Sequence, residues 1–184
     1  MSHYIAFLRA INVGGHVVKM DYLKSLFQDL GFSNVETFIA SGNVLFGSSI
    51  ADAAALEEKI ENHLLKSLGY EVTTFIRTFD EVAALARYRP FAHADTGKTP
   101  TLVVGFLKRT LAGPSKKLLL SMSSEIDTLN TSGREIFWIS RNRQSESTFS
   151  NALFEKKLSL QTTFRGYLTI VKLSMKNPGT AGGS

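Results

Sequence analysis

The first residues with chemical potential follow an apolar segment near the start of the chain. Two cations and an amide surround a Gly-Gly pair just before a predicted helix, and these residues are Arg9, Asn12, Gly14, Gly15 and Lys19. Glycines let backbone N–H groups approach a phosphate, and a guanidinium can bind an oxyanion with two hydrogen bonds. The pattern therefore indicates an anion-binding loop, although it is neither a P-loop nor a dinucleotide fingerprint. The alternative is a plain turn with Arg9 paired to a carboxylate.

A second group lies in a short turn between two predicted strands. Ser41, Gly42 and Asn43 could present a hydroxyl and an amide to a substrate. Serine and asparagine are also favoured in turns, because their side chains hydrogen-bond the local backbone. Both interpretations fit, and the sequence leaves open whether this turn lies beside the first group.

A third group is basic and belongs to the second half of the chain. The polar segment 141–148 contains Arg141 and Arg143 before a predicted helix, and Arg165 and Lys172 follow farther on. Arginines at a helix N-terminus predict contact with a phosphate or a nucleic acid. A capping box surrounded by solvated charges is the alternative.

Charge is unevenly distributed along the 184 residues, whose net charge is +5. Residues 1–90 hold eight Lys and Arg against ten Asp and Glu, which gives −2, whereas residues 91–184 hold thirteen against six, which gives +7. The second half should therefore attract polyanions or acidic metabolites. A solvated basic surface that only maintains solubility is the alternative.

Composition excludes several classes of chemistry. The chain contains no cysteine, which rules out disulfides and thiol catalysis, and its four histidines lack metal-ligand spacing, so we expect no metal site. The sequence indicates no particular cofactor. No apolar run approaches the roughly 20 residues of a membrane span, and the first residues do not resemble a signal peptide. We therefore expect a cytoplasmic protein that does not bind membranes.

The first half of the chain predicts a ferredoxin-like α+β unit over residues 1–88. Residues 4–11 are almost continuously apolar, which is typical of a central strand covered on both faces. The other expected elements are a helix from 19 to 31, a hairpin of strands over 35–40 and 43–46, a helix from 52 to 69 and a strand over 71–77. The order β-α-β-β-α-β predicts an antiparallel sheet with two helices on one face.

The second half predicts a related but incomplete unit over residues 98–176. A turn-rich stretch over 89–100 follows a short helix over 80–88 and marks the boundary. The pattern then gives a strand over 102–107, a helix from 114 to 122 and a hairpin over 127–131 and 135–140. Two further helices are expected, within 148–158 and 164–175, and residues 177–184 form a tail.

RNA binding in the manner of RNA-recognition motifs is disfavoured. Those domains use a similar sheet with a basic-Gly-aromatic signature on the third strand. Here that strand covers residues 43–47, Asn-Val-Leu-Phe-Gly, and lacks the signature.

Five segments of the chain resemble the DUF1697 family. They are residues 4–15, 19–20, 37–46, 89–91 and 163–173. The resemblance implies a bacterial cytoplasmic protein with tandem ferredoxin-like units and no named activity. It also highlights a set of polar and glycine positions: Arg9, Asn12, Gly14, Gly15, Lys19, Ser41, Gly42, Asn43, Arg165, Thr169 and Lys172.

The tail differs from the family pattern. The family usually has Thr-Thr-Arg-Asn-Trp-Asn-Thr where residues 163–169 read Thr-Phe-Arg-Gly-Tyr-Leu-Thr, so two amides and an indole are absent. A usual Ser-Lys pair is replaced by Ser147 and Thr148. An activity that needs those groups would not extend to this chain.

Three functional hypotheses follow. The leading one is binding of a phosphate-bearing ligand, either a nucleotide-like metabolite or nucleic acid, through the first group and basic residues of the second half. The second is a small-molecule enzyme with its site between the units, where Lys19, Ser41 and Arg165 would act as base, hydroxyl donor and anion clamp. The third is a protein-interaction or oligomerisation module.

Overall fold

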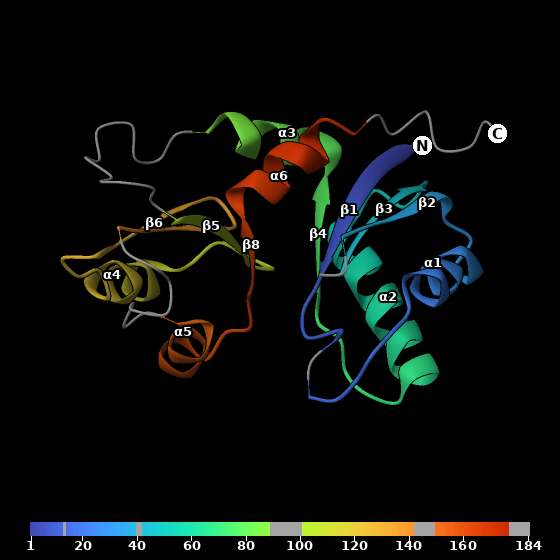
Figure 1. The fold of residues 1–184 in the computed structure, drawn as a ribbon, viewed down its shortest axis with the longest axis horizontal. Helices are drawn as coiled ribbons and strands as arrows, with labels where there is room; N and C mark the ends of the chain where they lie inside the picture. The colour runs from blue at the N-terminus through green and yellow to red at the C-terminus, as the bar shows by residue number, and fades with distance from the viewer. Residues whose placement is uncertain (13, 40–41, 89–100, 142–149, 177–184) are drawn as a thin grey trace. The chain divides into compact units, whose positions relative to one another are not determined.

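The computed structural model describes residues 1–12, 14–39, 42–88, 101–141 and 150–176. Within them the strands form two four-stranded antiparallel sheets, with helices interspersed along the chain (Figure 1). The chain divides into two compact units, Met1–Leu85 with the described residues from Val171 onward, and Ala86–Ile170. The predicted α+β class is confirmed. In this part of the chain no helix has the length and apolarity needed to span a membrane.

The first unit contains the predicted β-α-β-β-α-β order. Its elements are β1 (Ser2–Leu8), α1 (Met20–Asp29), β2 (Ser33–Phe38), β3 (Asn43–Ser48), α2 (Ala53–Leu68) and β4 (Thr74–Thr78), followed by α3 (Phe79–Arg87). The sheet order is β2-β3-β1-β4, so β1 pairs with both β3 and β4. Figure 1 shows α1 and α2 on the same side of this sheet.

The ends of α2 confirm the signals expected from the sequence. The Asp52 carboxylate accepts a hydrogen bond from the Ala54 N–H at 2.9 Å, which satisfies one of the unpaired donors at the helix start. Gly69 ends the helix in the left-handed region at a φ of 80°. By contrast, α1 begins after Lys19 without a side-chain cap.

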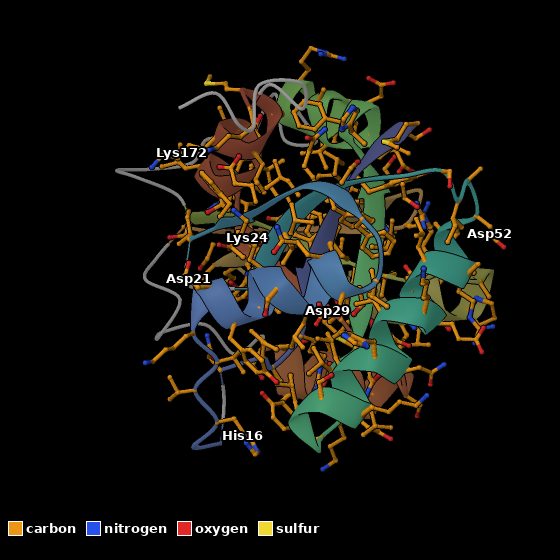
Figure 2. All side chains as sticks on the ribbon, turned by 90° about the vertical axis from the view of Figure 1, so that its right-hand side faces the viewer. His16, Asp21, Lys24, Asp29, Asp52 and Lys172 are labelled. Carbon is orange, nitrogen blue, oxygen red and sulfur yellow. The ribbon has the colours of Figure 1, made fainter. Side chains whose placement is uncertain are left out.

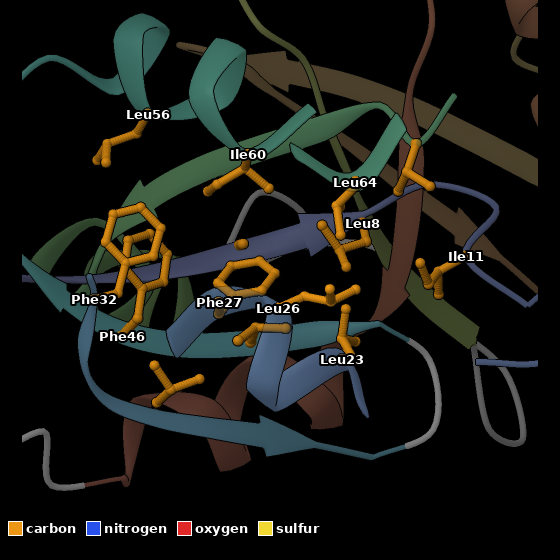
Figure 3. Packing of buried hydrophobic residues seen from close by; sticks show 14 of the residues in the cluster. Leu8, Ile11, Leu23, Leu26, Phe27, Phe32, Phe46, Leu56, Ile60 and Leu64 are labelled. Atoms are coloured by element: carbon orange, nitrogen blue, oxygen red, sulfur yellow. The ribbon is translucent and has the colours of Figure 1, made fainter. Parts of the chain in front are cut away.

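Alternation along β1 explains its continuous apolar sequence. Tyr4, Ala6 and Leu8 belong to the core beneath α1 and α2, whereas Ile5 and Phe7 point to the other face and are also fully buried. Figure 3 shows Phe32 and Phe46 side by side at one end of this core, where their ring centroids are 4.4 Å apart, and Ile11 at the other end.

The second unit is a complete plait and not the shorter unit expected from the sequence. Its elements are β5 (Thr101–Phe106), α4 (Gly113–Ser121), β6 (Asp127–Ser132), β7 (Glu135–Ser140), α5 (Asn151–Leu158) and β8 (Thr163–Gly166), and α6 (Tyr167–Ser174) follows. The sheet order is β6-β7-β5-β8. Leu119 of α4 and Phe154 of α5 pack into one core with Val103 and Trp138, so both helices cover the same face.

The two helices expected in the tail are present as α5 and α6, but the second begins only at Tyr167, because residues 163–166 form the unexpected strand β8 between them. This strand has four residues, too few to show a period, and its neighbours Tyr167 and Leu168 continue into a helix. It becomes a strand because Val104 of β5 pairs with Arg165. Tertiary pairing therefore overrides the local pattern.

The two sheets repeat the same register. Ile5 on β1 lies opposite Leu45 and Arg77, and Val104 on β5 lies opposite Phe137 and Arg165. The N–H at the end of each central strand also makes the same hydrogen bond: the last residue of β1, Leu8, donates to the Gly42 carbonyl at 2.8 Å, and Leu107, just after β5, donates to the Arg134 carbonyl at 2.9 Å. Arg77 and Arg165 thus occupy equivalent positions in the two units.

Glutamates close the outer edge of β4. Alternate backbone N–H groups of this strand each donate to a glutamate: Thr74 to Glu61 at 2.8 Å, Ile76 to Glu57 at 3.0 Å and Thr78 to Glu81 at 2.7 Å. The second unit repeats the first of these contacts, because the Thr162 N–H donates to Glu155 at 3.0 Å. Occupied donors make this edge a poor template for pairing with another strand.

We predict that Glu57→Ala lowers the free energy of unfolding by about 1–3 kcal/mol, because it leaves the buried Ile76 N–H without its acceptor. The neighbouring Glu58 is exposed, so Glu58→Ala should change stability by less than about 0.5 kcal/mol. Urea denaturation of both variants measures the difference. Equal free energies of unfolding for the two variants would show that the hydrogen bond from Ile76 to Glu57 does not stabilise the protein.

Candidate functional site

The loop over residues 9–19 joins β1 to α1 and is fixed at both ends. The Arg9 N–H donates to the Thr73 carbonyl at 2.8 Å, which extends the pairing of β1 beyond its last residue. The Asn12 Oδ1 accepts a hydrogen bond from the Val18 N–H at 2.7 Å and so closes the loop across its base. Asn12, predicted as a ligand group, therefore has a positioning role in this loop.

Tyr70 supports the loop from the segment after α2. Its hydroxyl donates to the Ile11 carbonyl at 2.9 Å, and its ring stacks on His16 with the centroids 3.9 Å apart. Burial raises the pKa of Tyr70 above 10.0, so the hydroxyl remains protonated at neutral pH and can donate. Figure 2 shows His16 projecting from the loop, away from Asp21 and Lys24 on α1. Sequence reasoning missed Tyr70 and His16, because 59 residues separate Tyr70 from Ile11.

The middle of the loop is open to solvent. Gly14 and Gly15 are exposed with φ values of 69° and 87°, and a Cβ at either position would meet no atom within 4 Å. These glycines are required by backbone conformation and not by packing. Lys19 is also exposed, whereas Arg9 is half-buried, and Val13 lies outside the described residues.

The second group lies directly beside this loop, which answers the question left open by the sequence. Gly42 is buried with a φ of 74°, and a Cβ there would lie 2.7 Å from Ile11 Cγ2 and 3.2 Å from Leu8 Cβ. Asn43 is fully buried, and its Nδ2 donates to the Phe38 carbonyl at 3.0 Å, so it closes the hairpin from inside. Ser41 lies outside the described residues.

Arg165 belongs to the second unit and is 8% exposed. Its Nη1 donates to Thr163 Oγ1 at 2.7 Å and to the Phe164 carbonyl at 3.0 Å. Burial lowers its pKa to about 10, so the guanidinium stays charged at neutral pH. Arg77, at the equivalent position of the first unit, is fully buried and likewise donates from Nη1 to the preceding carbonyl, at 2.7 Å.

The remaining predicted cations belong to other elements of the chain. Lys172 is exposed in the last turn of α6. Arg141 is exposed after β7, and residues 142–149 lie outside the described part of the chain. Among the described residues, no group of three or more His, Asp and Glu could hold a metal ion.

The loop therefore combines a fixed base with an exposed glycine backbone and two basic side chains. Residues 9–19 contain Arg9 and Lys19 and no Asp or Glu. Asp21 is exposed in the first turn of α1 and already balances the positive end of that helix. The chemistry available here is recognition of an anion by loop amides and cations.

We predict that Gly42→Ala destabilises the protein more than Gly31→Ala. Both glycines have positive φ, 74° and 79°, so each alanine should cost roughly 1–2 kcal/mol in backbone strain. Only Gly42 has Leu8 and Ile11 against its Cβ position, which should add about 1–3 kcal/mol of overpacking. Thermal unfolding of the two variants compares them directly, and equal losses would contradict tight packing of the turn against the loop.

Comparisons with known proteins agree with this architecture. A solved structure, described as that of conserved bacterial protein SP0830 from Streptococcus pneumoniae, superimposes with a TM-score of 0.71 at 25% identity and covers 95% of this chain and 97% of its own. A search of proteins with curated descriptions found no match. The model of the family "Protein of unknown function (DUF1697)" matches residues 1–137. This match spans well over half of the chain, which therefore belongs to the DUF1697 family.

Proposed function

We propose that the protein binds a small phosphate-bearing ligand, such as a nucleotide-like metabolite, at the loop over residues 9–19. The observation that carries this proposal is that the loop is fixed at its base by Asn12 and Tyr70, while Gly14, Gly15 and Lys19 face solvent. A loop held in one conformation pays less conformational entropy on binding.

The exposed glycines suit an anion for a steric reason. A Cβ at Gly14 or Gly15 would lie in open space, so the backbone N–H groups of this stretch can be approached closely from outside. Lys19, at the start of α1, supplies a charge beside them. Arg9 is half-buried at the base of the loop.

His16 and Tyr70 add a flat aromatic pair to the same loop. The interplanar angle of the pair is 22°, and His16 is exposed. An aromatic ring exposed at the surface can stack against a planar group of a ligand. This favours a nucleotide-like ligand over inorganic phosphate alone.

We predict that Lys19→Ala weakens binding of ATP or ADP about 5- to 30-fold, because a charge-assisted hydrogen bond contributes on the order of 1–2 kcal/mol at an exposed site. Lys24 is exposed on the same helix, so Lys24→Ala is the matched control and should bind like the original protein. Isothermal titration calorimetry at low salt gives both affinities. No binding of ATP, ADP or pyrophosphate, or equal losses in both variants, would refute the site.

We also predict that Tyr70→Phe weakens the same ligands while leaving every charge in place. The substitution removes the hydroxyl that holds the Ile11 carbonyl, so the loop should gain freedom that binding must then remove. The expected loss is severalfold in affinity, with about 1 kcal/mol in stability. Titration and thermal unfolding of the same sample measure the two effects. Unchanged affinity in a destabilised variant would show that the loop is not organised by Tyr70.

A further inference from the structure

Several basic residues of the second unit lie at one end of its sheet. Phe106 ends β5, and the exposed Lys108 and Arg109 come next. Phe106 pairs with Glu135 at the start of β7 and with Thr163 at the start of β8. The β6–β7 turn and the segment that enters β8 therefore lie at this same end.

Both helices of the unit bring lysines to this end. The helix α4 follows β5 and α5 precedes β8, so in this topology α4 starts and α5 finishes here. Lys116 and Lys117 lie in the first half of α4, and Lys156 and Lys157 lie in the last turn of α5. All four side chains are exposed. We call Arg109 and these four lysines the basic end of the second unit.

Acidic side chains do not neutralise these two helices. The helix α4 contains no Asp or Glu, and α5 contains only Glu155. Glu155 is half-buried, and its Oε1 accepts the Thr162 N–H at 3.0 Å, so its charge is held against the backbone. The exposed charge on α4 and α5 is therefore entirely positive.

The corresponding helices of the first unit show that this charge is not a requirement of the fold. Asp21 and Asp29 accompany Lys24 on the exposed side of α1, as Figure 2 shows, and Glu58 accompanies Lys66 on α2. The same architecture thus carries mixed charge in one unit and positive charge in the other. Because the corresponding helices of the first unit lack this excess of positive charge, the basic end of the second unit indicates a polyanionic partner.

From this distribution we propose that the basic end of the second unit binds the phosphate backbone of a nucleic-acid duplex without reading its sequence. The only aromatic side chain of α4 and α5, Phe154, is fully buried, so these helices offer no platform on which the bases of a single strand could stack. Leu118 and Leu120 are each only 38% exposed, which is a narrow apolar surface for insertion into a membrane. Phosphate contacts by lysines need neither feature. The proposal concerns a different unit and a different ligand from the loop over residues 9–19, and it does not depend on that site.

Fluorescence anisotropy with a labelled duplex of about 20 base pairs tests the proposal. If the four lysines each contact a phosphate, affinity should fall about 100-fold between 50 and 200 mM salt, and a variant with all four lysines changed to glutamine should lose most of this salt dependence. Lys24→Gln with Lys66→Gln, two exposed lysines of the first unit, is the control and should bind like the original protein. Thermal unfolding confirms that each variant is folded.

Four results would overturn the proposal. They are no duplex binding at 50 mM salt, equal binding by the four-lysine variant and the control, tighter binding to single strands of the same sequence, and binding to phosphatidylserine vesicles in place of the duplex. ATP titration of the four-lysine variant separates this proposal from the loop site. Retained ATP affinity with lost duplex affinity is the expected result, and loss of both would overturn the independence of the two surfaces.

Discussion

A hydrogen bond from the end of the central strand to the turn of the following hairpin organises both units. In the first unit it joins the Leu8 N–H to Gly42, and in the second it joins the Leu107 N–H to Arg134. Because β1 and β3 are antiparallel neighbours, the end of one strand must meet the beginning of the other. The loop after the central strand is therefore always built against the hairpin turn, and Gly42 is needed where the two meet.

The buried charged groups also share one requirement, which is a hydrogen-bond partner. Arg77 is fully buried and Glu57 is 4% exposed, and buried charges are tolerated only when they are hydrogen-bonded. Glutamates of α2 accept hydrogen bonds from backbone N–H groups of β4. Each of the two equivalent arginines, in β4 and β8, donates to the backbone carbonyl of the residue before it. The two units thus share contacts that satisfy their edge strands and their buried guanidinium groups.

The two units differ in the segments that follow their central strands, which these internal contacts do not constrain. After β1 the first unit has a long loop with two exposed glycines, closed by Asn12 and supported by Tyr70. After β5 the second unit passes through Lys108 and Arg109 into a helix whose exposed charges are all positive. Shared internal pairing with different loops at the strand ends allows one architecture to present two different surfaces, and we propose an anionic ligand for each.

Several elements could be predicted from the amino-acid sequence because their signals are local. Periodicity located α1 and α2, Asp52 and Gly69 marked the ends of α2, and the β-α-β-β-α-β order predicted the first plait, because capping and amphipathic spacing act within a few residues. Arg9, Gly14, Gly15 and Lys19 were likewise recognisable as one loop. Features that depend on distant partners could not be predicted in this way. The strand β8 forms because β5 pairs with it, Gly42 is constrained by Ile11, and the Tyr70 hydroxyl donates to a carbonyl 59 residues away. Only the tertiary structure showed that Asn43 and Arg165 are buried within their units, because exposure depends on packing that no single segment encodes.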